Sequence, residues 1–221
     1  MAIVINGSGS ITGLSVGGLP DGCVDTDMLA TDAVTNAKVA NDAINTNELV
    51  NSAVTAAKSS GIGGITDFDE WYVGGNTTGN QEPYTSWTRS NTTSSVHGIK
   101  GGTMSHSSGI WTFPSTGYWF VSFTAWTFNQ NRKNRYSQYR IKTTSDNSSY
   151  SEQAAGGCRN EDDNGDGNGA TYVSAHCHTI FDVQDTSTHK VRFDGIHEDT
   201  SSAAMGGRNF THFTVMKLGD T

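Results

Sequence analysis

The sequence predicts an all-β protein in which an N-terminal hairpin and a repeat shaft are followed by a jelly-roll β-sandwich knob. Three observations predict this class. Many short apolar runs are separated by polar, Gly-rich turns, with 26 Gly and only 3 Pro, and no convincing helical period accompanies them. Apolar residues also recur at a fixed spacing of five near the N-terminus, and within the stretch Gly109–Phe128 the strand Tyr118–Phe128 is apolar on both faces.

The hairpin is predicted for residues 1–21. Two short alternating runs, Ala2–Ile5 and Ile11–Val16, are joined by a turn that begins with Asn6-Gly7. Asn-Gly between β-type runs is the strongest short hairpin signal. Because an isolated hairpin is only marginally stable in water, we expect residues 1–21 to dock on another structure.

Residues 22–58 form an internal repeat, which we interpret as a shaft. A spacing of five matches neither the 3.6-residue period of a helix nor the two-residue period of a strand, so one copy cannot bury these residues on one face. Two interpretations remain open: three chains that wind around a common axis, or a series of short helical turns docked on the knob. The shaft positions are Val24, Leu29, Val34, Val39, Ile44, Leu49 and Val54.

Residues 59–66 are Gly-rich and predict a hinge, after which the knob covers residues 67–221. We expect eight strands in the knob, separated by polar turns. Their expected positions are Asp69–Val73, Thr85–Thr88, Gly109–Phe113, Tyr118–Phe128, Tyr136–Lys142, Thr171–Val183, Lys190–His197 and Phe210–Leu218.

The run Tyr118–Phe128 is the central strand of this prediction. Pro114 and Gly117 break the chain just before it, which predicts a tight corner between two strands. Large apolar residues then occupy both alternating sets of positions. A strand that is apolar on both faces must be covered on both sides, so we expect one face in the core and the other against a second subunit.

The segment Gly-Ile-Trp-Thr-Phe-Pro-x-x-Gly-Tyr-Trp-Phe-Val-Ser-Phe (109–123) resembles the core strand pair of the complement-type, tumour-necrosis-factor-like jelly roll. Phe210–Leu218 resembles the last strand of that fold in bacteriophage fibre proteins, and the region from Trp87 to Met104 resembles the phage versions too. The opening residues and the repeats are similar to those of marine, cyanophage-type fibre proteins. The resemblance to the jelly roll covers Asp67 to Leu218 and implies a homotrimer.

Composition excludes several classes of partner. With 14 basic against 22 acidic residues the net charge is −8, and no basic stripe suits nucleic acid. No apolar run approaches the ~20 residues of a membrane span, so we expect no membrane insertion. The N-terminus has no charged region before a long apolar stretch, so we expect no export by a signal peptide.

Cys23, Cys158 and Cys177 lie far apart and are odd in number, which favours free thiols.

Two sets of residues could bind metal. Asp162, Asn164 and Asp166 match the start of a calcium-binding loop at 162–167, although Val173 stands where its closing acid belongs. The alternative is an exposed acidic loop. His176 and His178 point to the same face of a strand, and the resemblance to phage fibre tips implies that such pairs can share one metal on a threefold axis. Away from such an axis, the pair would simply form a polar strand face.

Receptor contacts are expected in two loops at the far end of the knob, Asn129–Arg135 and Gly156–Gly169, because loops on a rigid sandwich can vary freely. Exposed aromatic residues beside amide side chains suit sugars, and Trp126, Tyr136 and Tyr139 are candidates whose alternative role is packing. The candidate receptor residues are Asn129, Arg132, Arg135, Tyr136, Arg159, Asp162 and Asp163.

The sequence carries no recognisable catalytic motif, so we expect no enzyme and no required cofactor. The leading hypothesis is a trimeric phage virion fibre, made in the bacterial cytoplasm. Its N-terminus would attach to other virion proteins and its knob would bind a host-surface glycan or protein. The alternative is a non-adhesive decoration protein of the phage head or tail.

Overall fold

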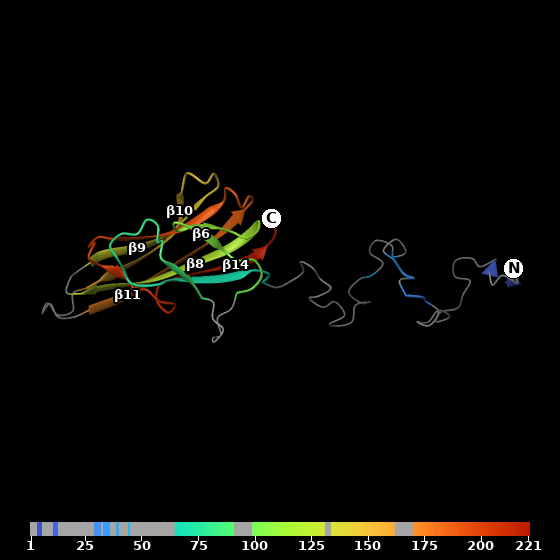
Figure 1. Cartoon of the computed structure of the whole chain (residues 1–221), viewed down its shortest axis with the longest axis horizontal. Helices are drawn as coiled ribbons and strands as arrows, with labels where there is room; N and C mark the ends of the chain where they lie inside the picture. The colour runs from blue at the N-terminus through green and yellow to red at the C-terminus, as the bar shows by residue number, and fades with distance from the viewer. Residues whose placement is uncertain are drawn as a thin grey trace. The chain divides into compact units, whose positions relative to one another are not determined.

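The computed structural model describes residues 4–5, 11–12, 29–31, 33–35, 39, 44, 65–90, 99–130, 134–161 and 170–221. The chain divides into two units, Met1–Gly63 and Gly64–Thr221, and the division falls inside the stretch 59–66 that was predicted as a hinge. Figure 1 shows the strands of both units in chain order. In the described part of the chain no helix is long and apolar enough to cross a membrane.

The first unit contains one described strand pair. β1 (Val4–Ile5) and β2 (Ile11–Thr12) run antiparallel, with Ile5 opposite Ile11. Four of the seven shaft positions are described, and all four side chains are exposed by 37–57% within the single chain: Leu29, Val34, Val39 and Ile44. The other three, Val24, Leu49 and Val54, lie outside the described residues.

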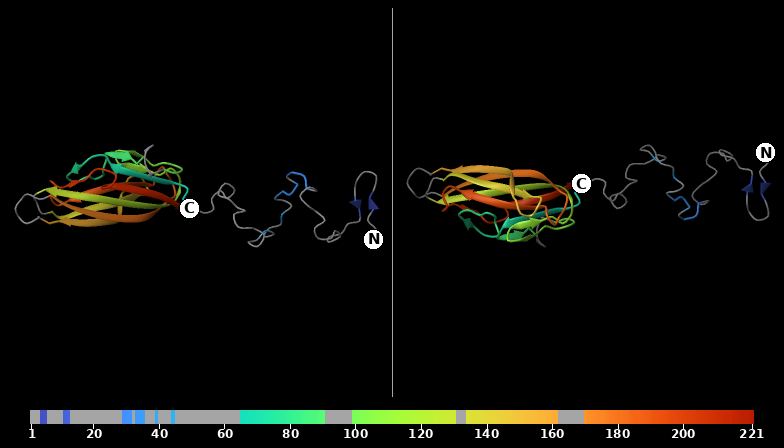
Figure 2. Two further views of the ribbon diagram at one scale, coloured as in Figure 1. Left: turned by 90° about the horizontal axis from the view of Figure 1, so that it is seen from below. Right: turned by 90° about the horizontal axis from the view of Figure 1, so that it is seen from above.

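The second unit is a sandwich of two antiparallel sheets, whose layers are visible in both views of Figure 2. The first sheet has seven strands in the order β4-β13-β8-β14-β3-β5, with β11 on the other edge of β8. Its strands are β3 (Phe68–Val73), β4 (Thr77–Thr78), β5 (Trp87–Arg89), β8 (Gly117–Gln130), β11 (Ala170–Val183), β13 (Ala203–Ala204) and β14 (His212–Gly219).

The second sheet has five strands in the order β10-β9-β12-β7-β6. Its strands are β6 (Ser105–Ser107), β7 (Ile110–Thr112), β9 (Asn134–Thr144), β10 (Ser151–Asn160) and β12 (Lys190–His197). The sequence prediction missed β10 entirely, because SEQAAGGCRN has few β-branched or aromatic residues. It also missed the short strands β4, β6 and β13.

The core lies between the sheets and is rich in aromatic rings. Trp111 of the second sheet is fully buried, and its ring centroid lies 4.9 Å from that of Trp71 and 4.6 Å from that of Phe213 in the first sheet. β8 alternates as predicted: Trp119, Val121, Phe123, Ala125 and Thr127 are buried, and the residues between them are partly exposed. Cys177 is also buried, with 6% exposure, and both it and Cys158 are free thiols, as predicted for these two cysteines.

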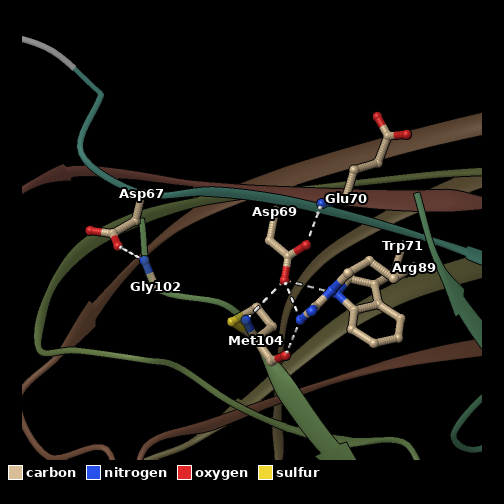
Figure 3. Close-up of polar contacts among 7 residues, drawn as sticks. All are labelled: Asp67, Asp69, Glu70, Trp71, Arg89, Gly102 and Met104. Carbon is tan, nitrogen blue, oxygen red and sulfur yellow. Dashed lines mark hydrogen bonds and ion pairs between the residues drawn. The ribbon is translucent and has the colours of Figure 1, made fainter. Parts of the chain in front are cut away.

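One buried carboxylate links two strands and the segment before a third near the start of the knob (Figure 3). Asp69 on β3 is 1% exposed, and its Oδ2 accepts hydrogen bonds from Trp71 Nε1 at 3.0 Å, Met104 N at 2.9 Å and Arg89 Nη2 at 3.2 Å. Its Oδ1 accepts from Glu70 N at 3.0 Å. The carboxylate therefore connects β3 to β5 and to the segment that enters β6.

Candidate functional site

The structure gathers three of the predicted receptor residues at one end of the β9–β10 pair. Arg135 and Tyr136 lie on β9, and Arg159 lies beside them on β10, because Cys158 pairs with Ser137. The side chains of Arg135 and Arg159 are 79% and 62% exposed, and Tyr136 is 49% exposed. Gly156–Asn160 thus belong to an edge strand, and the prediction that placed them in a loop is wrong.

Both arginines are paired with carboxylates. The Arg135 backbone N–H donates to Glu198 Oε2 at 2.7 Å and its side chain pairs with Oε1, which holds the pKa of Glu198 below its ordinary value. Arg159 Nη2 lies 2.6 Å from Glu161 Oε1. Both arginine side chains remain accessible to a ligand, since they are 79% and 62% exposed, and exposed ion pairs of this kind are weak.

Two aromatic or amide candidates are not accessible. Asn129 is 1% exposed, and its Nδ2 donates to Ser202 Oγ at 2.8 Å. Its assignment as a receptor contact is wrong, because the inward face of β8 continues through residue 129. Tyr139 is also 1% exposed, with its hydroxyl 2.7 Å from Thr127 Oγ1, and burial raises the pKa of that phenol.

The remaining candidates in the two loops lie outside the described residues. These are Arg132, Asp162, Asp163, Asn164 and Asp166. The proposed calcium loop at 162–167 therefore stays a prediction.

An open hollow of about 400 Å³ lies on the outward face of the second sheet, lined by Tyr136, Ser137, Gln138 and Gly157. Its shape follows from the register of β9 and β10. Gln138 lies opposite Gly157, which has no side chain, so the space beside the Gln138 amide stays empty. Tyr136 and Ser137 complete the lining of this space.

Arg140 orients the amide of Gln138. It lies two residues further along β9, and its Nε donates to Gln138 Oε1 at 3.0 Å while its Nη2 donates to the same oxygen at 2.5 Å. Since the oxygen is occupied, the Gln138 amide nitrogen is the group free to donate to a ligand within the described part of the chain. Arg140 also pairs with Glu152 Oε2 at 3.1 Å on β10.

This combination of groups suits a sugar. An aromatic ring offers a flat apolar surface to the C–H face of a pyranose, while amide and guanidinium groups donate to its hydroxyls. Sequence reasoning identified Tyr136 but missed Gln138, Arg140 and Gly157. The alternation Tyr136-x-Gln138-x-Arg140 could have revealed Gln138 and Arg140, because alternate residues of a strand share one face. Gly157 could not be identified in this way, because β10 was not predicted.

The two histidines of the predicted metal pair lie on the outward face of β11 and are exposed. Their ring centroids are 5.7 Å apart, and His176 Nδ1 lies 3.0 Å from Thr124 Oγ1 on β8. Among the described residues of one chain, no group of three His, Cys, Asp or Glu could hold a metal ion. A metal at His176 and His178 would need further ligands from outside the described residues of one chain, and the pair stays a prediction.

The outward face of the first sheet carries an unusual amount of exposed apolar surface. Tyr172 stacks near Phe128 with ring centroids 5.4 Å apart, and Ile180 is paired in register with Phe120. The large apolar residues that are 45–60% exposed on or beside β8, β11 and β14 are Tyr118, Tyr172, Ile180 and Leu218. Exposed apolar patches on rigid sheets commonly mark protein–protein contacts.

The strand order and the site define the class of this protein: an antiparallel β-sandwich of jelly-roll type with an open hollow on one sheet. No protein-family model matches the chain, and no curated protein matches its sequence.

Among solved structures, that of murine APRIL at pH 5.0 is similar, with 8% identity, a TM-score of 0.49, and coverage of 69% of this chain and 98% of that chain. The structure of Eiger TNF from S. frugiperda is similar with 11% identity, a TM-score of 0.47, and coverage of 70% of this chain and 95% of that chain. The strand order of this chain is itself that of a jelly-roll sandwich.

Proposed function

We propose that this chain is a homotrimeric fibre protein of a bacteriophage virion whose knob binds a host-surface glycan during attachment. Residues 1–21 would dock on other virion proteins, and residues 22–58 would form the shaft. The observation that carries the binding role is the hollow beside Tyr136 and Gln138. The phage assignment rests on the resemblance of the N-terminal segment and repeats to phage fibre proteins. The chain would be made in the host cytoplasm and reside in the virion.

Two features support a homotrimer. The outward face of β8 and β11 exposes Tyr118, Tyr172 and Ile180, which are costly to leave in water. Leu29, Val34 and Ile44 of the shaft are exposed in the same way within a single chain. Three copies around one axis would cover both sets. The knob and the shaft would then assemble together.

A glycan fits the hollow better than a protein does. The site is open and small, and it is lined by one aromatic ring, one amide and backbone of an edge strand. A flat protein surface would meet few anchors there, whereas a sugar ring can stack on Tyr136 and accept a hydrogen bond from Gln138. Binding needs no covalent step. A trimer would present three such sites, so that weak single contacts add through multivalency.

The test is binding of the full-length chain to an array of bacterial surface polysaccharides. We expect Tyr136→Ala and Gln138→Ala each to weaken binding at least tenfold while the oligomer stays intact by light scattering. Gln184→Ala is the matched control, because Gln184 is exposed just after β11 and, among the described residues, its Nε2 donates to Asp182 Oδ2 at 2.9 Å.

Equal binding by all three variants would show that the hollow is not the site. If, in addition, phage carrying both hollow substitutions adsorb to host cells as well as wild type, the decoration role becomes the better account. The two measurements therefore separate loss of the site from loss of the whole adhesive function.

A further inference from the structure

A cluster of cations continues directly from the hollow along β9. The outward residues of this strand follow one another as Tyr136, Gln138, Arg140 and Lys142, about 7 Å apart at each step. Arg192 of the neighbouring strand β12 is paired in register with Lys142. Tyr136 to Lys142 is therefore a strip about 20 Å long, which is the length of a short oligosaccharide.

The carboxylates within this strip do not balance its cations. Lys142 Nζ and Arg192 Nη2 share a single oxygen, Oδ2 of Asp194, each at 3.1 Å. The carboxylate of Asp194 is fully buried beneath them, whereas Lys142 and Arg192 are 15% and 21% exposed. The two cations therefore lie over a buried acid and are themselves partly exposed, and the Arg192 guanidinium also packs over the Tyr150 ring at 4.8 Å. With Arg140 and its partner Glu152 included, the strip has three cations and two carboxylates.

Glu152 is the one carboxylate of this group at the surface. It is 42% exposed and pairs with Arg140 at 3.1 Å. An exposed ion pair of this type contributes little, so an anionic ligand group can replace Glu152 on the Arg140 guanidinium. On a chain whose net charge is −8, the three cations of the strip outnumber the two carboxylates that pair with them, and this excess would attract an anion toward the hollow.

We propose that the strip recognises an acidic glycan, with a carboxylate or sulfate group held by Arg140, Lys142 and Arg192 while a neighbouring sugar ring occupies the hollow. This inference rests on the proposed glycan-binding function and adds the chemical class of the ligand. Arg140 links the two parts, because it orients Gln138 and also faces the anion. Glu152 occupies the place of the ligand's anionic group when no ligand is bound.

The test uses matched pairs of ligands with the full-length wild-type chain, measured by isothermal titration calorimetry. The pairs are oligogalacturonate and its carboxyl-reduced form, sialyllactose and lactose, and dextran sulfate and dextran. We expect the acidic member of at least one pair to bind tenfold or more tightly than its neutral partner. That preference should shrink as salt is raised from 50 to 500 mM, and the preferred pair distinguishes carboxylate from sulfate.

Protein variants provide a second readout. Glu152→Gln should raise the affinity for the acidic ligand at least threefold, because the competing carboxylate is gone. The affinity for the neutral ligand should not change. Asp220→Asn is its control, since Asp220 is an exposed carboxylate paired with Lys217 away from the strip. Lys142→Gln should lower the affinity for the acidic ligand at least fivefold. Lys100→Gln is the control for this substitution.

Equal affinity for both members of every pair, with no effect of Glu152→Gln, would overturn the acidic preference and leave glycan binding standing. Binding of no glycan, acidic or neutral, would overturn this inference together with the proposed function. A gain of affinity in Glu152→Gln cannot come from unfolding, so it supports the inference even if Lys142→Gln proves unstable.

Discussion

Asp69 is a single residue on which the start of the knob depends. Its two oxygens accept four hydrogen bonds from three segments of the chain, and one donor is the Arg89 guanidinium. Asp69→Asn removes the charge and turns one acceptor into a donor that faces other donors. We expect a loss of about 3–5 kcal/mol in the free energy of unfolding, measured by urea denaturation.

The control for Asp69 is Asp220→Asn, in which the lost carboxylate is 84% exposed. We expect this variant to change the unfolding free energy by less than about 0.5 kcal/mol. If both variants unfold at the same urea concentration as wild type, the Asp69 contacts do not hold the strands together.

His197 makes the stability of the knob depend on pH. The side chain is 2% exposed, its Nδ1 lies 2.8 Å from Ser137 Oγ, and its Nε2 is buried without a partner among the described residues. Burial lowers the pKa of His197 to about 4, with a smaller opposing effect of Asp199. In the unfolded chain the pKa of His197 is near 6.5. As the pH falls, the unfolded chain therefore binds a proton before the folded chain does. The contribution of His197 to the unfolding free energy is therefore fully present only above the unfolded pKa of 6.5.

As the pH falls from about 6.5 to 4, the unfolding free energy should decrease by about 3 kcal/mol through His197 and then level off. His197→Gln removes this part of the slope. Urea midpoints of both proteins at pH 7 and pH 4.5 test the effect, because carboxylates that titrate in the same range are common to both. Parallel pH profiles would show that His197 does not contribute.

At the scale of elements, the sandwich closes where β10 meets β11. A Cβ on Gly156 would lie 2.6 Å from the backbone oxygen of His176, whereas a Cβ on Gly157 would have its nearest atom at 3.8 Å. Gly156→Ala should therefore push β10 away from β11 and lower the unfolding free energy by about 1–3 kcal/mol. Gly157→Ala should change it little. Hydrogen exchange of β10 amides would locate the effect, and equal stability of the two variants would contradict it.

At the scale of the whole molecule, the outward face of β8 and β11 predicts self-association. Ile180 is 60% exposed in the single chain and should contribute about 1.5–3 kcal/mol when covered by another copy. Light scattering should give three times 23.6 kDa, about 71 kDa, for the wild-type chain. Ile180→Asp should yield the monomer with unchanged circular dichroism, because the position is on the surface of each copy.

Gln153→Asp is the control for this substitution, since it places the same charge at an exposed position of the other sheet. A wild-type monomer at micromolar concentration would overturn the homotrimer. Dissociation by both aspartate variants would instead point to general charge repulsion.

The sequence by itself determined the all-β class and most of the long strands. The alternation of Trp119, Val121 and Phe123 with partly exposed neighbours was readable from the chain, because side chains of a strand alternate between two faces. The corner at Gly117 was readable too: its φ of +135° is one that few other residues adopt.

Only the tertiary structure decided where β10 lies and therefore where the hollow is. The residues of β10 are held in a strand by pairing with β9, not by their own preference for extended structure, so no local pattern revealed them. The same long-range pairing leaves Gly157 beside Gln138, and it turns Asn129 inward although its neighbours in sequence suggested a loop. Which side chains share a surface depends on strand register, and register is fixed by contacts between residues far apart in the chain.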